Sequence, residues 1–126
     1  MTKEVVASES APAAVGAYSQ AIVANGFVFC SGQIALDPAT NELVQGSIAD
    51  ETRRCLENLQ AVLAEAGIGF DHVVKVTAYL ADIGDFAEFN ETYAGFAGSA
   101  PPARAAFAVK DLPKSARVEI ECIAAL

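Results

Sequence analysis

The chain has 126 residues, which suits one domain spanning residues 1–126, because domains most often run to roughly 100–150 residues. Its net charge of −8 argues against a nucleic-acid partner, which would need a clustered basic patch, and Arg53-Arg54 is the only adjacent basic pair. Alanine supplies 26 residues and tryptophan none, so large apolar side chains are few and part of the apolar burial is expected across a subunit interface.

The expected location is cytoplasmic, with no membrane partner. No apolar run approaches the roughly 18 residues that span a bilayer, and the N-terminal residues lack the charged-then-apolar pattern of a signal peptide. The three cysteines, Cys30, Cys55 and Cys122, are odd in number and lie in apolar sequence. This pattern favours reduced, buried thiols over a disulfide framework.

The first half of the chain predicts a β-hairpin and then a long helix. Residues 27–30 are β-branched, aromatic or apolar and follow the turn-forming pair Asn25-Gly26, so they predict a strand whose hairpin partner is residues 18–23. The segment Ser47-Ile48-Ala49-Asp50 has the form of a capping box, and apolar residues follow at spacings of three and four until Gly67. This spacing predicts an amphipathic helix of about five turns.

The second half predicts a strand, a shorter helix and two more strands. Residues 72–80 are rich in β-branched side chains, and residues 103–109 and 116–124 predict the last two strands. Residues 85–88 repeat the capping pattern, and the helix after them carries an aromatic stripe that we expect to pack in the core. The stripe consists of Phe86, Phe89, Tyr93 and Phe96. Helices joined to strands by short loops indicate an α+β fold, with both helices on one face of a mixed sheet.

Charged side chains mark the sheet face that the helices leave uncovered. Alternation along the last strand puts Arg117, Glu119 and Glu121 on that face. A solvated, half-exposed strand shows the same pattern, so these charges alone do not establish a site. Arg104 is more informative because it stands among apolar residues, where an arginine is usually paired with a carboxylate of the protein or of a ligand.

Five short motifs occur together along the chain. They are Gly16-Ala17-Tyr18, Ser31-Gly32-Gln33, Asn90-Glu91-Thr92-Tyr93, Pro102-Ala103-Arg104 and Val118-Glu119-Ile120-Glu121-Cys122-Ile123-Ala124. In this order and spacing, over nearly the whole chain, they resemble the RidA (YjgF-type) family of enamine/imine deaminases. The resemblance implies a chorismate-mutase-like α+β fold and a homotrimer, whose sheets associate around a central barrel with clefts between subunits. Such an assembly would cover the exposed sheet face.

The resemblance also implies a reaction. Family members hydrolyse 2-aminoacrylate and 2-aminocrotonate, or the imine tautomers 2-iminopropanoate and 2-iminobutanoate, to 2-keto acids and ammonia. These substrates come from pyridoxal-phosphate dehydratases acting on serine or threonine, and the family enzymes use no metal and no cofactor. The sequence agrees, because its one histidine, His72, has no cysteine or acidic cluster at ligand spacing and no glycine-rich phosphate loop is present. We expect His72 to be structural.

Residue by residue, the resemblance assigns roles. Arg104 matches the family arginine that holds the substrate carboxylate through two parallel donors. Glu119 matches the acid that activates the attacking water and can return the proton to departing ammonia. Tyr18 and Ser31 match positions that line the pocket, and Gly32 lets backbone approach closely because it has no Cβ.

Three further positions matter to this assignment. Asn90 matches a family position that either contacts the ligand or orients the cleft wall. Ala17 stands where many members have proline, which loosens the loop of Tyr18 modestly. Ala106 stands where many have cysteine, and the change costs little if this substrate-binding position offers chiefly its backbone carbonyl to the imine nitrogen.

The sequence leaves a second class of function open. A catalytically silent family member would bind a small carboxylic acid at the same cleft, as a sensor or partner protein. Such a protein needs Arg104 but not Glu119, so the presence of both favours the enzyme. Ribonuclease activity, which is also associated with the family, is not expected from scattered basic residues and a net charge of −8.

Overall fold

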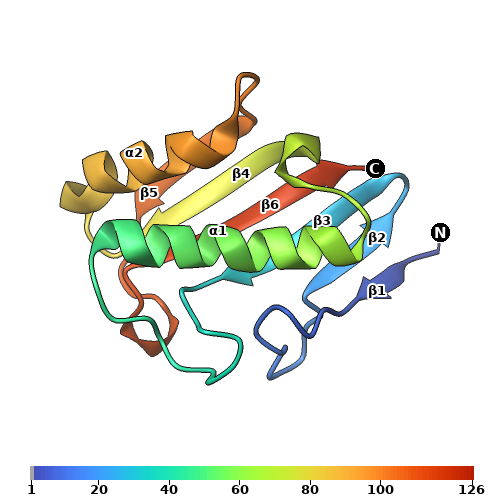
Figure 1. The fold of residues 1–126 in the computed structure, drawn as a ribbon, viewed down its shortest axis with the longest axis horizontal. Coiled ribbons are helices and arrows are strands. Elements are labelled where there is room, and N and C mark those ends of the chain that lie inside the picture. Colours follow the sequence, from blue (N-terminus) through green and yellow to red (C-terminus); the bar gives the residue numbers. More distant parts are fainter. Residues whose placement is uncertain (1) are drawn as a thin grey trace.

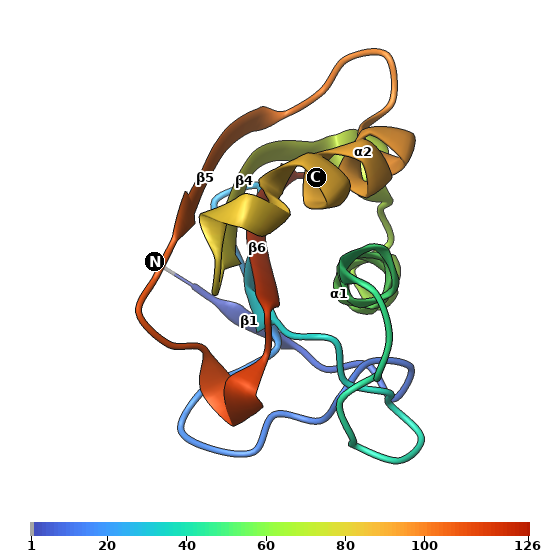
Figure 2. The same ribbon diagram turned by 90° about the vertical axis from the view of Figure 1, so that its left-hand side faces the viewer.

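Two helices cover one face of a six-stranded mixed sheet in the computed structural model, which describes residues 2–126 (Figure 1). The strands are β1 (Glu4–Val6), β2 (Ala21–Ala24), β3 (Phe27–Gln33), β4 (Val73–Leu80), β5 (Ala103–Ala108) and β6 (Val118–Ala125), and the helices are α1 (Ile48–Glu65) and α2 (Phe86–Ala97). The strand order is β1-β2-β3-β6-β4-β5, with β4 and β5 parallel and the other pairs antiparallel. Figure 2 shows both helices on the same side of the sheet, which confirms the predicted α+β fold.

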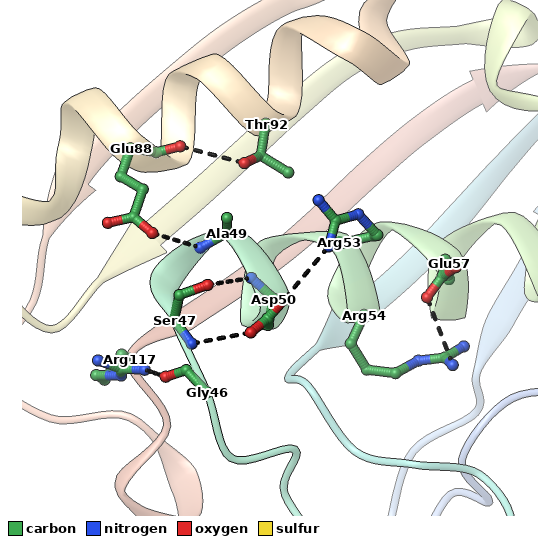
Figure 3. Close-up of polar contacts among 10 residues, drawn as sticks. All are labelled: Gly46, Ser47, Ala49, Asp50, Arg53, Arg54, Glu57, Glu88, Thr92 and Arg117. Carbon is green, nitrogen blue, oxygen red and sulfur yellow. Dashed lines mark hydrogen bonds and ion pairs between the residues drawn. The ribbon is translucent and has the colours of Figure 1, made fainter.

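Helix α1 begins where the sequence predicts. The Ser47 hydroxyl accepts from the Asp50 backbone N–H at 3.1 Å, and the Asp50 carboxylate accepts from the Ser47 N–H at 3.1 Å (Figure 3). This reciprocal capping box satisfies two of the N–H groups that a helix start leaves without partners. The 18 residues of α1 make five turns, and its apolar stripe is buried against the sheet.

Helix α2 begins differently from the prediction. Asp85 makes no capping hydrogen bond to any residue that the structure describes, because it ends a 3-10 turn, Ile83–Asp85, with helical dihedral angles that continue directly into α2. The predicted capping pattern at residues 85–88 is therefore wrong. Glu88 instead accepts from the Ala49 N–H at 3.0 Å, which joins the first turns of the two helices (Figure 3).

The aromatic stripe on α2 belongs to the core, as predicted. Phe89 and Tyr93 are buried and their rings stack with centroids 5.7 Å apart. Phe86 and Phe96 are half-buried and pack against the same core. The stripe holds α2 on the sheet, and its rings also reach the edge strand β5, as described below.

The sheet holds one strand that the sequence did not predict. The predicted hairpin is confirmed as β2–β3, and its turn residues Asn25 and Gly26 have φ of 51° and 80°, as a two-residue hairpin turn requires. β1 pairs with β2 and has three residues, which is too short for an alternating pattern to be visible in the sequence.

The sheet face away from the helices is uncovered in the single chain. It carries the exposed aromatic residues Phe27, Phe29 and Phe107. Arg117 was predicted on this face, and that prediction is wrong. The guanidinium binds the Glu51 carboxylate on α1, because Arg117 precedes β6 and is free of its alternation. It also donates to the Gly46 carbonyl (Figure 3). Within residues 2–126, no helix has the length and apolar character to cross a membrane.

Candidate active site

A cavity of about 440 Å³ opens on the uncovered side of β3 and β6. We call it the Glu119 cavity. Its lining includes four of the residues that the resemblance selected and one that it did not, namely Tyr18, Ser31, Gly32, Glu119 and Lys114. They come from the loop before β2, from β3, from β6 and from the 3-10 turn Pro113–Ser115. Lys114 has no motif to mark it in the sequence, and it reaches the cavity from a left-handed backbone position, with φ of 55°.

Gly32 makes room for the Glu119 carboxylate. A Cβ at Gly32 would overlap Oε2 of Glu119, so any larger residue here would force the end of the Glu119 side chain to move. The pairing of β3 with β6 is irregular between Cys30 and Gln33, so Gly32 lies in a bulge that brings its backbone under the carboxylate. Gly32 therefore matters for the space that it leaves to the Glu119 carboxylate, and positive-φ freedom plays no part.

Glu119 has the environment of a general base. Burial and the neighbouring charge of Glu121 raise the pKa of Glu119 above its ordinary value. Both effects disfavour the charged form, so the carboxylate accepts a proton more readily than a solvated one. Glu119 is thus a carboxylate with a raised proton affinity in the wall of an open cavity.

The loop that carries Tyr18 is braced from below by Gln20, which sequence reasoning missed. The buried Gln20 side chain accepts from the Ser8 N–H and donates to the Pro12 carbonyl at 2.7 Å. The Ser31 hydroxyl donates to the Ser19 carbonyl at 2.6 Å, which ties the same loop to β3. No short motif marks a buried glutamine of this kind, because its partners lie eight and twelve residues away.

Arg104 lies on the other side of the sheet. Its register partner on β4 is the buried Val76, so its side chain points toward α2. Nη1 donates to Oδ1 of Asn90 at 2.7 Å, and the guanidinium lies over the Tyr93 ring, 4.8 Å from its centroid. Two more rings of the aromatic stripe, Phe86 and Phe89, lie 5.5 and 5.9 Å away. Cation–π contacts and one hydrogen bond therefore hold the cation in place.

The sequence left the role of Asn90 open, and the structure gives it a contact. Asn90 accepts from Arg104, and both line a second cavity of about 360 Å³ with Tyr93 and the prolines that precede β5. We call it the Arg104 cavity. Ala106 is two residues further along β5 and packs against the core instead of lining either cavity.

The structure therefore divides the selected residues into two groups. Tyr18, Ser31, Gly32 and Glu119 share the Glu119 cavity, and Asn90 and Arg104 share the Arg104 cavity. Because Glu119 and Arg104 point to opposite sides of the sheet, one copy of the chain does not bring them together.

His72 and the three cysteines have contacts or burial that suit a structural role. His72 is exposed, and its Nδ1 lies 2.9 Å from the Ala125 carbonyl, so it ties the turn before β4 to the end of β6. All three cysteines are free and buried, as predicted. Burial raises the pKa of Cys55, and the hydrogen bond with Cys30 together with burial raises that of Cys122. Among residues 2–126, no group of three or more His, Cys, Asp or Glu side chains is placed to hold a metal ion.

Sequence comparison identifies relatives over the full length. The family model described as Endoribonuclease L-PSP matches residues 8–126. The RutC family protein of Pyrococcus horikoshii is 52% identical over 122 residues, which cover 97% of this chain and 97% of that protein. A rat protein named 2-iminobutanoate/2-iminopropanoate deaminase is 47% identical over 122 residues, which cover 97% of this chain and 89% of the rat protein.

Solved structures agree with the fold. RidA from an Antarctic Psychrobacter superposes with a TM-score of 0.94 at 40% identity and covers 98% of this chain and 99% of that one. TdcF from E. coli, solved with bound serine, superposes with a TM-score of 0.93 at 35% identity, over 98% of each chain. Both the family model and the full-length relatives agree with the resemblance carried by the five motifs. The chain belongs to the Endoribonuclease L-PSP family, which is the RidA (YjgF-type) family.

Proposed function

We propose that this protein is a deaminase that hydrolyses 2-iminopropanoate and 2-iminobutanoate, with their enamine tautomers, to 2-keto acids and ammonia. The proposal rests on the Glu119 carboxylate, which lies over Gly32 and has a raised pKa. It also rests on the Arg104 guanidinium, which aromatic rings hold in place and which can bind an anion. Relatives that bear the name 2-iminobutanoate/2-iminopropanoate deaminase support it, among them the rat protein at 47% identity and the bovine protein at 44%.

Arg104 would bind the substrate carboxylate. Its hydrogen bond to Asn90 uses one N–H of the guanidinium, and the aromatic rings hold its plane. A guanidinium has five N–H donors, so two parallel donors can still face a carboxylate and fix both its position and its orientation. This arrangement selects substrates that carry an acid group beside the imine.

Glu119 would move the proton. Its carboxylate accepts a proton from water as the water oxygen bonds to C2 of the protonated imine, which gives a tetrahedral carbinolamine. The protonated Glu119 then returns the proton to the amino group, and the C–N bond breaks as the C2 carbonyl forms. The hydroxyl proton of the carbinolamine passes through the Glu119 carboxylate to the departing ammonia, which leaves as ammonium. The protonated imine and water thus become the keto acid and ammonium, and Glu119 ends as the carboxylate with which it began. General acid–base catalysis of this kind contributes about 100- to 10,000-fold.

A homotrimer would bring the two cavities together. Within one copy, Glu119 and Arg104 lie on opposite sides of the sheet, so a substrate that contacts both must lie between neighbouring copies. The exposed aromatic residues Phe27, Phe29 and Phe107 offer the apolar surface for that association. We propose that each cleft takes Arg104 from one subunit and Glu119 from the next.

The cellular setting follows from the chemistry. Pyridoxal-phosphate dehydratases acting on serine or threonine release the imino acids that this enzyme would consume. We also propose a cytoplasmic location, because three free, buried thiols suit a reducing compartment. A silent carboxylate-binding protein is the less favoured alternative, since it would not need the Glu119 carboxylate beside Gly32.

The direct test couples the protein to a serine or threonine dehydratase and follows imine decay. We expect faster decay than in buffer, and a loss of kcat/KM of roughly 100-fold or more in Arg104→Ala, because two charge-assisted hydrogen bonds contribute about 3 kcal/mol. Arg53→Ala is the matched control, since Arg53 forms a surface pair with Asp50. Absence of acceleration by the parent protein, or an Arg104→Ala variant as active as the parent, contradicts the proposal. Binding without turnover would indicate the silent alternative.

A further inference from the structure

A second carboxylate lies beside Glu119 and is held by a tyrosine. Glu121 is two residues further along β6 on the same face, and Tyr79 faces Glu119 from β4. The Tyr79 hydroxyl donates a hydrogen bond to Oε1 of Glu121. The contact runs diagonally between neighbouring strands, since the direct partner of Glu121 on β4 is Thr77.

Tyr79 is itself fixed from the edge strand. Its ring packs edge-to-face on Phe107 of β5, with centroids 5.4 Å apart and an interplanar angle of 87°. The hydrogen bond to Glu121 raises the pKa of Tyr79 to about 12. The phenol therefore stays protonated at neutral pH and remains a donor to Glu121 throughout the range in which the enzyme would work.

The charged and titratable side chains around Glu119 come from five elements. They are Glu121 of β6, Tyr79 of β4, Lys114 of the turn Pro113–Ser115, Tyr18 of the loop before β2, and the buried thiol of Cys55 on α1. β3 adds only uncharged groups to the cavity, and Arg117 is bonded to Glu51 on α1. Among these groups Glu121 carries the like charge, and its charge adds to burial in raising the pKa of Glu119.

We propose that Glu121 is a positioning residue for the deamination, fixed beside Glu119 by Tyr79 so that its negative charge makes Glu119 a stronger base. The inference rests on the proposed function, because it assigns the base of that reaction to Glu119. The alternative is a contact that only joins β4 to β6. If the Tyr79–Glu121 contact were only structural, removing it would change the stability of the protein and leave the pKa of Glu119 unchanged.

The size of the expected effect follows from the strand geometry. Two residues along a strand span about 7 Å, and at an effective dielectric constant between about 40 and 80 a unit charge at that distance shifts a pKa by roughly half a unit to one unit. The parent enzyme loses kcat/KM as the pH falls through the raised pKa of Glu119. Removing the like charge lowers that pKa, so the variant retains its active fraction to lower pH.

The kinetic test compares four variants over pH in the dehydratase-coupled assay, with the coupling enzyme in excess at every pH. In Glu121→Gln we expect the acid limb to move down by half a unit to one unit and the plateau to fall about threefold, because a weaker base transfers protons more slowly. Glu121→Asp keeps the charge and should restore most of the parent profile. Tyr79→Phe keeps the ring contact but releases Glu121, so a smaller shift in the same direction is expected. Glu65→Gln, an exposed carboxylate at the end of α1, is the control and should match the parent.

A direct titration separates this inference from the proposed function. Carboxyl ¹³C NMR of glutamate-labelled protein, with the Glu119 signal assigned by its loss in Glu119→Gln, measures the midpoint without any substrate. We expect that midpoint to fall in Glu121→Gln and to stay near the parent value in Glu121→Asp. An unchanged midpoint in a Glu121→Gln protein with parental Tm overturns the proposal, and an unchanged midpoint in Tyr79→Phe overturns the part assigned to Tyr79. If the parent shows no deaminase activity, the proposed function fails while the titration still decides the role of Glu121.

Discussion

Mixing two inactive variants gives the sharpest test of a cleft shared between subunits. Arg104→Ala removes the proposed carboxylate-binding group from the Arg104 cavity, and Glu119→Gln removes the proposed base from the Glu119 cavity. In a trimer whose clefts each take one residue from each neighbour, a mixed trimer contains some clefts with both native residues. Random assortment of equal amounts makes the chance of a native arginine one half and of a native glutamate one half. About one quarter of the parent activity should therefore return.

The assay needs controlled subunit exchange. The two variants are co-expressed with different affinity tags, and doubly tagged trimers are isolated and counted by native mass spectrometry before the coupled assay. Doubly tagged trimers hold two subunits of one variant and one of the other, so one cleft in three is native. They should then reach about one third of parental activity. Co-expression of Arg104→Ala with Arg104→Ala,Glu119→Gln is the control and should restore nothing. Mixed trimers that stay as inactive as either variant would show that the two residues do not share a cleft, and a monomeric protein would remove the cleft altogether.

Three further variants test individual contacts. Gly32→Ala should reduce kcat by about 100-fold or more in the coupled assay, because the added Cβ displaces the Glu119 carboxylate, the proposed base. A variant with parental kcat would show that the close approach of Gly32 to Glu119 is unimportant. Asn90→Ala should raise KM more than it lowers kcat, because Arg104 loses its 2.7 Å hydrogen bond yet keeps its aromatic contacts, and an unchanged KM would contradict this. Arg117→Ala should cost about 1–3 kcal/mol in urea unfolding, because the buried Glu51 carboxylate loses its charged partner and keeps only the backbone N–H of residue 117, and the Arg117→Lys variant should lose less.

The sequence predicted those parts of the fold that depend on neighbours in the chain. The Asn25-Gly26 turn and the capping box of Ser47 and Asp50 involve contacts within three residues, and both were confirmed. The prediction for Arg117 was wrong because a distant partner decides its contact: Arg117 binds Glu51, which is 66 residues away. The capping pattern that begins at Asp85 was wrong because Asp85 ends a 3-10 turn that runs into α2, and Glu88, the last residue of the pattern, binds Ala49, which is 39 residues away. Local patterns carry no information on such pairs.

The same distinction applies to the candidate site. The resemblance selected the residues of both cavities, but the sequence did not reveal that Arg104 and Glu119 lie on opposite sides of the sheet. The isolated Arg104 was expected to pair with a carboxylate of the protein or of a ligand. Within the described residues its partners are Asn90 and three aromatic rings, and the carboxylate that we propose for it is that of the substrate. The contact of Tyr79 with Glu121 joins residues 42 apart and had no signal in the sequence.

The rings beneath Arg104 have a consequence for how substrate affinity evolves. An arginine side chain free in solution carries about 2 kcal/mol of rotamer entropy, which a ligand must normally overcome when it binds. Here Phe89 and Tyr93 belong to the buried core, so the guanidinium becomes ordered when α2 packs on the sheet, before any substrate arrives. A substitution that repacks the core beneath α2 can therefore weaken binding without touching the ligand. Under the proposed function, selection for a well-packed helix and selection for substrate binding act on the same aromatic side chains.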